Sequence, residues 1–536
     1  SKKTYKFSSE EKKLLLPSIS IYNKIYHQDF EKIIQHVFSL LSVGSKRFLV
    51  NKVDRSVSGL VVQQQTCGYP QLPVSDYGLT LLSHQNIQGI ATSIGEQPIK
   101  SLLDVESSIK LSIGEMLTNL MFVKIENFNS IKCSGNWMAA PKLDNDGYLF
   151  YKAVECVSKE LIKLGIAIDG GKDSLSMATK LNTEDNNNYV KSPLTFVLSS
   201  YVPVPNVYNR VTPDFKKENN IIMFVELGNS IKNISGSALY QTYNILGSTR
   251  ETPSPDLEKV KKVFLIIKKY LSHINTKEKV IYSGHDVSDG GLITTLLEMA
   301  FSGNKGININ LPIELHIKDY KNFINLMFSE DLGIVLEVSC NNYYKLFEEL
   351  KEITSTYLLG KVTNEKNLII NDTNLVYLNS PMHKLRNYWE KTSFALEEMQ
   401  TPKKIVQDEK FNIYVREEIP YSSYNYQNNK LTLPNYIHPK YKPKAGIIRE
   451  VGSNGEKEMA AAFYLANFDV YDINTNMLLN NPEVINKMDV LAFVGGFSFS
   501  DTLGSANGWA STLLHNKKIS LELKKFRENE NKYALG

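Results

Sequence analysis

Residues 283–291 read Ser-Gly-His-Asp-Val-Ser-Asp-Gly-Gly and place two carboxylates, two hydroxyls and three glycines between an expected strand and an apolar, expected helix. Glycines let the backbone turn tightly and approach a ligand. A helix start offers unpaired N–H groups to anionic oxygens, and nearby carboxylates hold the hard cation that accompanies a nucleotide. A capped turn has a similar composition. The segment therefore predicts a phosphate and metal site, with an ordinary turn as the alternative.

The bulk properties limit the class of protein. A chain of 536 residues is too long for a single core, so about three domains are expected. A net charge of +4 over this length gives no reason to expect a nucleic-acid partner. The four cysteines lack disulfide or zinc-ligand spacing, which favours a reducing, cytoplasmic setting. No apolar run approaches the roughly 20 residues of a membrane span, and the first residue is not methionine, so we expect a piece of a longer protein.

The pattern along the chain predicts a multidomain protein of the α+β and α/β classes. After a lead-in with a helix over residues 29–41, strands and helices alternate up to about residue 202. A polar break at 218–220 precedes a second α+β part with strands at 221–225, 280–283 and 333–338. A Tyr-, Asn- and Pro-rich stretch reads as a linker, followed by an open α/β pattern. The expected divisions are 1–44, 45–213, 214–400, 401–443 and 444–536.

Residues 170–174, Gly-Gly-Lys-Asp-Ser, follow the apolar run 164–168 and are expected to form a loop at the end of a strand. Such a loop presents a cation, a carboxylate and a hydroxyl, which suits a phosphate group. It lacks the longer glycine cradle of a Walker motif, and a plain turn is the alternative.

An expected helix over residues 107–121 carries Glu115 and Asn119 four residues apart, and therefore on one face, among apolar side chains. Buried oxygen atoms without partners cost a few kcal/mol, about 1–3 per group. The two side chains can bond each other or the backbone, they can lie at an exposed edge, or they can share a cation. Asp76 and Asp286 could complete an all-oxygen shell of the kind that magnesium prefers.

Several motifs together resemble one family, the long single-chain formylglycinamide ribonucleotide amidotransferases of purine biosynthesis. The resemblance runs in the family's order from about residue 29 to the end and has a tail similar to that family's glutaminase domain. The motifs are Asp54-Arg55-Ser56-Val57-Ser58-Gly59, Ser134-Gly135-Asn136-Trp137-Met138, residues 170–177, 283–292, 447–450, Gly452-Ser453-Asn454-Gly455, Gly495-Gly496-Phe497-Ser498 and Gly508-Trp509-Ala510.

The resemblance implies an ATP- and glutamine-dependent ligase. In this family ATP phosphorylates the amide oxygen of formylglycinamide ribonucleotide, and ammonia from glutamine displaces the phosphate. The family's synthetase part has two similar halves, each built from domains like the N- and C-terminal domains of aminoimidazole ribonucleotide synthetase. This chain resembles the second half followed by the first part of a flavodoxin-like class I glutaminase domain.

The same resemblance implies which groups lie elsewhere. The family's synthetase histidine belongs to the first half, and its glutaminase Cys, His and Glu would follow Gly536. No catalytic residue is therefore expected here, and the chain is expected to lack the overall activity. The other half and the rest of the glutaminase domain are expected as intramolecular partners of a full-length monomer.

Site residues carry over from the resemblance. In long relatives the second half holds a nucleotide with magnesium that is not turned over. The matching positions are Lys46, Ser75 and Ser288 for ATP or ADP, and Asp76, Glu115, Asn119 and Asp286 for Mg²⁺. The segments that match positions facing productive ATP and substrate in shorter relatives contain Ser134, Asn136, Gly171, Lys172, Asp173 and Ser174. Shorter relatives have an asparagine pattern at the latter segment, so Lys172 is expected to neutralise phosphate.

In the glutaminase part, Gly495 and Gly496 match one side of the family's oxyanion pocket. Ser500 stands where the family often has glycine, which puts the local backbone geometry in question. Cys340 is expected to be a small buried apolar residue rather than a nucleophile.

Two other interpretations stay open. One is a nucleotide-binding half in which bound ADP and magnesium only stabilise the fold and take no part in catalysis. The other is an independent ATP enzyme similar to aminoimidazole ribonucleotide synthetase or selenophosphate synthetase, against which the glutaminase-like tail argues.

Overall fold

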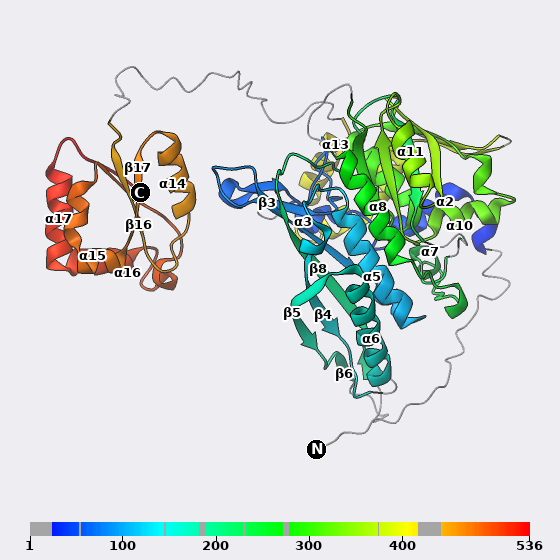
Figure 1. Ribbon diagram of the computed structural model, residues 1–536, viewed down its shortest axis with the longest axis horizontal. Coiled ribbons are helices and arrows are strands. Elements are labelled where there is room, and N and C mark those ends of the chain that lie inside the picture. Colours follow the sequence, from blue (N-terminus) through cyan, green and yellow to red (C-terminus); the bar gives the residue numbers. More distant parts are fainter. Residues whose placement is uncertain are drawn as a thin grey trace. The chain divides into compact units, whose positions relative to one another are not determined.

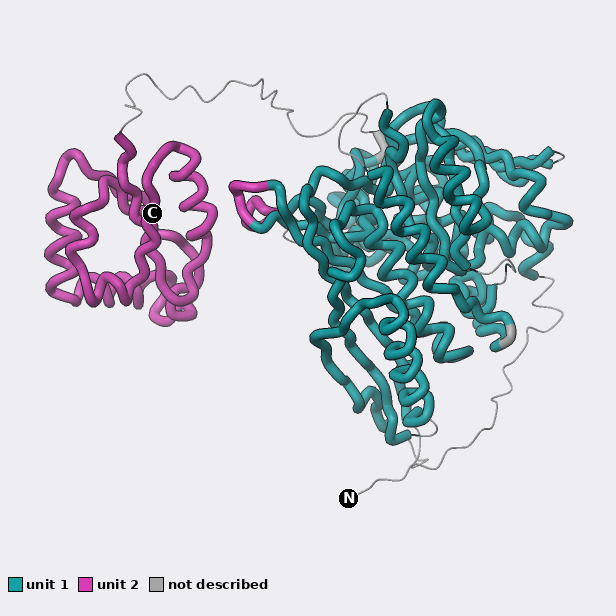
Figure 2. The backbone as a smooth tube through the Cα atoms, viewed as in Figure 1, with its two compact units in different colours: residues 1–55, 61–82, 87–420 teal, residues 56–60, 83–86, 421–536 magenta. Residues whose placement is uncertain are grey.

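The computed structural model describes residues 24–52, 55–143, 146–181, 189–228, 232, 234–271, 278–373, 375–415 and 441–536. The chain divides into two compact units, residues 1–55, 61–82 and 87–420, and residues 56–60, 83–86 and 421–536 (Figure 2). Both α+β parts belong to the first unit. The domain boundaries expected at residues 44, 213, 400 and 443 stay predictions.

The first unit contains a six-stranded sheet in the order β1-β2-β3-β8-β4-β5 (Figure 1). Its strands are β1 (Val61–Gln63), β2 (Gly78–Leu81), β3 (Gly89–Glu96), β4 (Lys132–Met138), β5 (Ala167–Ser174) and β8 (Thr195–Val204). Only the β4–β5 pair in this sheet is parallel. A small hairpin pairs β6 (Ala178–Lys180) with β7 (Tyr189–Lys191).

A seven-stranded sheet in the same unit has the order β10-β12-β9-β13-β11-β14-β15. Its strands are β9 (Ile221–Glu226), β10 (Ile281–Asp286), β11 (Gly306–Asn310), β12 (Gly333–Val338), β13 (Thr356–Thr363), β14 (Asn367–Asn371) and β15 (Val376–Pro381). β12 is buried along its whole length, as expected for a strand with both faces covered. The strands expected at 221–225, 280–283 and 333–338 are confirmed, with ends shifted by a few residues.

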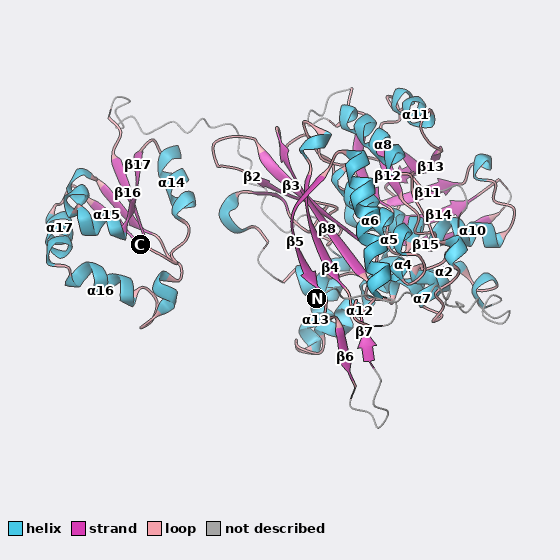
Figure 3. Ribbon diagram, turned by 60° about the horizontal axis from the view of Figure 1, so that its bottom comes forward, coloured by secondary structure: helices cyan, strands magenta, loops and turns pink. Residues whose placement is uncertain are grey.

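Helices cover both faces of the seven-stranded sheet (Figure 3). On one face, Val225, Ile334 and Leu336 share a core with the six-stranded sheet and with the helices between the sheets; on the other, Phe224 and Val335 pack with the remaining helices. The helices of this unit are α2 (Phe30–Phe38), α3 (Arg47–Val50), α4 (Pro98–Ser101), α5 (Val105–Leu120), α6 (Asp146–Leu164), α7 (Ala238–Gln241), α8 (Leu257–Tyr270), α9 (Gly291–Gly303), α10 (Tyr320–Phe328), α11 (Tyr344–Lys351), α12 (Met382–Glu397) and α13 (Lys403–Val415).

Helix α5 lies unusually close to β3, and this contact positions the site. The inward residues of β3 are small: Gly89, Ala91, Ser93 and Gly95 alternate with exposed residues. A Cβ atom on Gly95 would lie 2.0 Å from the Ser112 carbonyl oxygen and 2.5 Å from the Met116 nitrogen. The absence of a side chain at Gly95 therefore lets the backbone of α5 touch the end of β3.

The second unit is an open α/β fold with a parallel sheet in the order β17-β16-β18-β19. Its elements are β16 (Lys444–Arg449), α14 (Glu456–Leu465), β17 (Asp469–Asn474), α15 (Thr475–Asn480), β18 (Val490–Phe493), α16 (Asn507–His515), α17 (Lys517–Glu528) and β19 (Tyr533–Leu535). The expected order of strand, helix, strand and strand over 445–494 is confirmed.

Three expectations are wrong. Residues 170–174 form no loop, because they continue strand β5 in parallel pairing with β4. The first part of the expected linker is helix α13, which is tied to the unit by the Arg47–Glu409 ion pair and the buried Val406. Cys340 is exposed, just beyond the end of β12. Residues 1–23 of the lead-in and 416–440 of the linker lie outside the described residues, as does Asp54.

No helix in the described ranges combines the length and apolar character that a membrane crossing requires.

Replacing Gly95 with alanine tests the close contact between α5 and β3. The added methyl group would collide with helix backbone, and overpacking of this kind costs about 1–3 kcal/mol. We expect Gly95→Ala to lower the urea midpoint of unfolding. Gly170→Ala is the matched control, because a Cβ there meets nothing within 4 Å. Equal midpoints for the two variants would contradict the contact.

Candidate metal and nucleotide site

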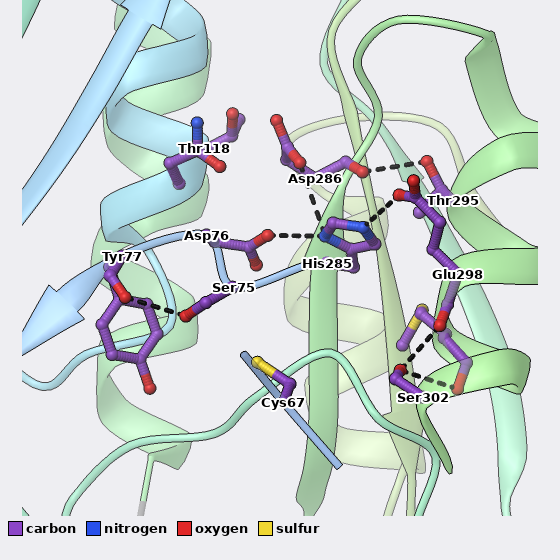
Figure 4. Close-up of polar contacts among 12 residues, drawn as sticks. Cys67, Ser75, Asp76, Tyr77, Thr118, His285, Asp286, Thr295, Glu298 and Ser302 are labelled. Atoms are coloured by element: carbon purple, nitrogen blue, oxygen red, sulfur yellow. Dashed lines mark hydrogen bonds and ion pairs between the residues drawn. The ribbon is translucent and has the colours of Figure 1, made fainter. Parts of the chain in front are cut away.

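Asp76, His285 and Asp286 come together in the first unit, with one possible ligand atom from each lying within 4.8 Å of the others (Figure 4). Asp76 lies just before β2, whereas His285 and Asp286 end β10. Nδ1 of His285 lies 2.6 Å from Oδ1 of Asp76 and 3.5 Å from Oδ1 of Asp286. The site therefore lies where the two sheets of the unit meet.

Helix α9 completes this side of the site. Glu298 of α9 places Oε2 at 2.9 Å from Nε2 of His285. Thr295, one turn earlier, donates its hydroxyl to the carbonyl of Asp286 at 2.9 Å. The strand β10 and the helix that follows it are therefore tied together at the carboxylates.

Oδ2 of Asp76 is buried and has no hydrogen-bond partner among the described residues. A buried carboxylate oxygen without a partner is costly, and it is the kind of atom that a hard cation takes as a ligand. The free atom belongs to a carboxylate, as do the nearby oxygens of Asp286 and, next to Asp286, of Glu115. This donor set fits Mg²⁺ better than a softer transition metal.

Glu115 and Asn119 reach the same region from α5. Oε2 of Glu115 accepts from the N–H of Glu96 at 2.8 Å and from Nε2 of Gln97 at 3.1 Å. Nδ2 of Asn119 donates to the carbonyl of Ile94 at 2.9 Å. The close packing of α5 on β3 thus points both side chains toward the end of that strand. The charge of Asp286 helps to raise the pKa of Glu115, so these two carboxylates lie near each other.

Carboxylates are crowded in this region, and their protons are held tightly. Burial, then the charge of Asp76, raises the pKa of Asp286 to about 7. Burial, then the charge of Asp286, raises the pKa of Glu115 well above its usual value. Burial also raises the pKa of Asp76, although His285 opposes that shift. Buried like charges without a bound cation repel in this way.

The carboxylates around His285 favour its protonated form. Burial by itself lowers the pKa of His285, but the charge and hydrogen bond of Asp76, with Glu298, raise it well above the usual value. Both partners are carboxylates and can only accept, so both ring nitrogens donate when the carboxylates are ionised.

Of the residues expected to face nucleotide, Lys46 lies beside the cluster. Burial lowers the pKa of its ammonium, and the charges of Glu298 and Asp289 oppose that shift. Its Nζ donates to the carbonyl of Ser42. Ser75 donates its hydroxyl to the carbonyl of Tyr77 at 2.8 Å, and Ser288 is partly buried in the turn before α9.

A protein carboxylate accepts a hydrogen bond from the residue just before α9. The N–H of Gly290 donates to Oε1 of Glu330 at 2.8 Å, and the N–H of Gly291 donates to the carbonyl of Ser288 at 2.9 Å. Glu330 is itself paired with the buried Lys100. The N–H groups of Gly290 and Gly291 are therefore not open to an anionic ligand, contrary to expectation.

Comparisons with known proteins agree with the order of these domains. Residues 45–203 match the FGAR-AT PurM_N-like domain, 217–372 the C-terminal domain of AIR synthase related protein, and 442–536 the CobB/CobQ-like glutamine amidotransferase domain. The chain is 39% identical to phosphoribosylformylglycinamidine synthase of Dictyostelium discoideum over 95% of this chain and 39% of that protein. It is 37% identical to the Homo sapiens enzyme over 97% of this chain and 38% of that protein.

The chain is homologous to part of phosphoribosylformylglycinamidine synthase. It spans about two fifths of the length of the curated relatives it matches. Among solved structures, T. maritima PurL complexed with FGAR has a TM-score of 0.48 at 12% identity, over 69% of this chain and 55% of that chain. The expected fold class, two synthetase-like domains followed by a glutaminase domain, is confirmed by the domain matches.

The second expected group lies on two paired strands of the PurM-like domain. Ser134 and Asn136 of β4 pair in register with Gly170 and Lys172 of β5. Lys172 and Asp173 are exposed at the edge of the sheet, and Gly171 packs against the Gly135 carbonyl. Within the described part of the chain, no hydrogen bond or ion pair connects these residues to the carboxylate cluster.

In the glutaminase-like unit, Gly495 and Gly496 follow β18 and meet the loop after β16. The carbonyl of Gly495 accepts from the N–H of Asn454 at 2.8 Å, and Gly496 has a φ of 115°. Gly495 is exposed, with open space around its Cα. Ser500, where the family often has glycine, has a φ of 53°, so this serine adopts the left-handed conformation that glycine takes freely.

Three further residues of the site went unassigned from sequence: His285, Glu298 and Glu96. His285 stands inside the motif at 283–291, directly before the predicted ligand Asp286, and this adjacency was the only available signal. Glu298 lies two turns into α9 on its β10 side, which helical spacing could have shown. Glu96 contributes its backbone N–H, for which its side chain gives no signal.

The raised pKa of Asp286 predicts that cation binding depends on pH. In the metal-free chain this shift contributes stability at low pH that is lost as the pH rises from about 4 to about 7. A protonated Asp286 cannot bind Mg²⁺, so we expect the gain in melting temperature on adding Mg²⁺ to be small at pH 6 and larger at pH 8.

The measurement is thermal unfolding with and without Mg²⁺ at both pH values, repeated on Asp286→Asn. The gain should be absent in this variant at either pH. The same gain at pH 6 and pH 8 in the unmodified chain would contradict the role of Asp286.

Proposed function

We propose that this chain is the second synthetase half and the beginning of the glutaminase domain of a phosphoribosylformylglycinamidine synthase. The complete protein would convert formylglycinamide ribonucleotide to formylglycinamidine ribonucleotide in purine biosynthesis. ATP would phosphorylate the substrate amide oxygen, and ammonia from glutamine would displace that phosphate. The products would be ADP, phosphate and glutamate.

The order and extent of the matches support this proposal. Two synthetase-type domains and a glutamine amidotransferase domain follow one another in one chain, and relatives of that name are 36–39% identical over 95–100% of it. The alternative of an independent aminoimidazole ribonucleotide synthetase-like enzyme does not explain the glutamine amidotransferase match at 442–536.

For the cluster itself we propose a magnesium–nucleotide site that stabilises the fold. Asp76, Glu115, Asn119 and Asp286 would hold Mg²⁺, and Lys46, Ser75 and Ser288 would face ADP or ATP. The observation that carries the proposal is the buried Oδ2 of Asp76, which has no hydrogen-bond partner among the described residues. It lies among carboxylates whose pKa values are raised by burial and then by the charge of a neighbouring carboxylate. Bound magnesium would neutralise this charge and connect the carboxylates to phosphate oxygens.

The chain's own residues also support a structural role. Without a cation, the repulsion between Asp76, Glu115 and Asp286 disfavours the folded state, so a bound cation adds directly to stability. Lys46 would add a positive charge for phosphate, while Glu330 accepts from the N–H of Gly290 and keeps that group from it. A ligand that binds only the folded state at a thousandfold excess over Kd stabilises it by about 4 kcal/mol.

The remaining sites stay proposals of the same kind. Residues of β4 and β5, Ser134, Asn136 and 171–174, would face productive ATP and substrate. Gly495 and Gly496 would form one side of the glutaminase oxyanion pocket. The other synthetase half and the rest of the glutaminase domain would be intramolecular partners of a cytoplasmic monomer.

Removing two ligands should remove the effect of the nucleotide. We expect ADP with Mg²⁺ to raise the melting temperature of the chain by several degrees, since about 1 kcal/mol shifts it by about 2–4 °C in domains of this size. The double variant Asp76→Asn, Asp286→Asn should show no gain. Differential scanning fluorimetry with ADP, with Mg²⁺ and with both measures this.

Asp408→Asn, an exposed carboxylate on α13, is the matched control and should keep the gain. An undiminished gain in the double variant would reject the assignment of the ligands. The enzymatic proposal is tested separately, by assaying glutamine-dependent amidine formation with the protein read from a reading frame extended on both sides.

A further inference from the structure

His285 lies at the centre of the cluster and is held from both sides. Its side chain is 7% exposed. One neighbour, Asp76, lies in the segment before β2, and the other, Glu298, lies on α9. Nδ1 contacts Oδ1 of Asp76 at 2.6 Å, and Nε2 contacts Oε2 of Glu298 at 2.9 Å. Each ring nitrogen therefore has a carboxylate partner at full hydrogen-bond strength.

These two contacts direct both ring nitrogens of His285 at carboxylate oxygens rather than at a metal. A histidine binds a metal through a deprotonated ring nitrogen, whereas both nitrogens here are directed at acceptors. The proximity of His285 to Asp76 and Asp286 would otherwise suggest a mixed nitrogen and oxygen site. Such a site would favour zinc or cobalt over magnesium.

The contact with His285 also decides how Asp76 is oriented. Oδ1 of Asp76 is taken by the imidazole, and Oδ2 is the buried oxygen that has no partner among the described residues. Glu298 fixes the far edge of the ring, and the carbonyl of Glu298 is held by the Ser302 hydroxyl at 2.6 Å. Side-chain contacts therefore run from Glu298 through His285 to Asp76, while Ser302 contacts only the backbone of Glu298 (Figure 4).

We infer that His285 is a positioning residue for the cation site: it holds Asp76 so that Oδ2 faces the cation, and it is not itself a ligand. The inference rests on the proposed magnesium site. It goes further by assigning a role to a residue that the resemblance leaves unassigned. Partners of this kind orient a ligand without touching the metal, and losing one weakens metal affinity about 10–100-fold.

Mn²⁺ tests both halves of the inference, because it substitutes for Mg²⁺ and can be followed by electron paramagnetic resonance. Titration of the 536-residue chain gives the affinity, and pulsed spectra of the loaded chain report any directly bound imidazole ¹⁴N. We expect the unmodified chain to bind Mn²⁺ without a nitrogen ligand. His285→Gln should bind about 10–100-fold more weakly, and Asp76→Asn should lose binding.

His515→Gln, an exposed histidine on α16, is the matched control and should bind as the unmodified chain does. A directly coordinated imidazole signal in the unmodified chain would overturn the inference while leaving the metal site intact. An unchanged affinity in His285→Gln would overturn the positioning role. Failure of the unmodified chain to bind Mn²⁺ would reject the proposed metal site, and the inference with it. The nitrogen measurement needs no variant, so it decides the question even if His285→Gln folds poorly.

Discussion

The gathering of carboxylates between the two sheets of the first unit is the constraint on which the rest of the structure depends. Asp76, Glu115 and Asp286 come from three separate parts of the chain. The fold brings them to one region, where burial raises the pKa values of all three. Buried like charges oppose folding unless a proton or a cation compensates them. The architecture around them keeps these groups in place despite that cost.

Several local features serve this arrangement. Gly95 lets α5 approach β3, which brings Glu115 to the N–H of Glu96. Hydrogen bonds from α9 fix β10 and His285. Glu330, paired with Lys100, accepts from the N–H of Gly290, the residue before α9. The result is a site in which Oδ2 of Asp76 has no hydrogen-bond partner among the described residues. This carboxylate oxygen suits a cation rather than an anion.

Much of this could be predicted from sequence, and the rest failed for physical reasons. Apolar runs predicted the central strands of the second sheet, and helical spacing placed Glu115 and Asn119 on one face of α5. The role of His285 could not be predicted because it depends on a contact with Asp76, which is 209 residues away in the chain. Local pattern carries no information about such a contact.

Each wrong expectation has an identifiable cause in the structure. Gly-Gly-Lys-Asp-Ser has the composition of a turn, yet pairing with β4 keeps it extended as β5. Helix α13 has no clear apolar period but is held by Arg47 and by the burial of Val406. Cys340 follows a buried strand, and its exposure reflects the end of that strand at Val338. In the first two cases tertiary contacts outweighed the preference of the segment itself.

Crystals of the chain grown with ADP and Mn²⁺ test the central claim most directly, because the anomalous signal of manganese locates the cation without assumptions about its ligands. The account predicts a single strong peak in contact with Oδ2 of Asp76 and with carboxylate oxygens of Asp286 and Glu115, next to phosphate oxygens of the nucleotide. Full nucleotide density elsewhere, with no anomalous peak among these carboxylates, would contradict it.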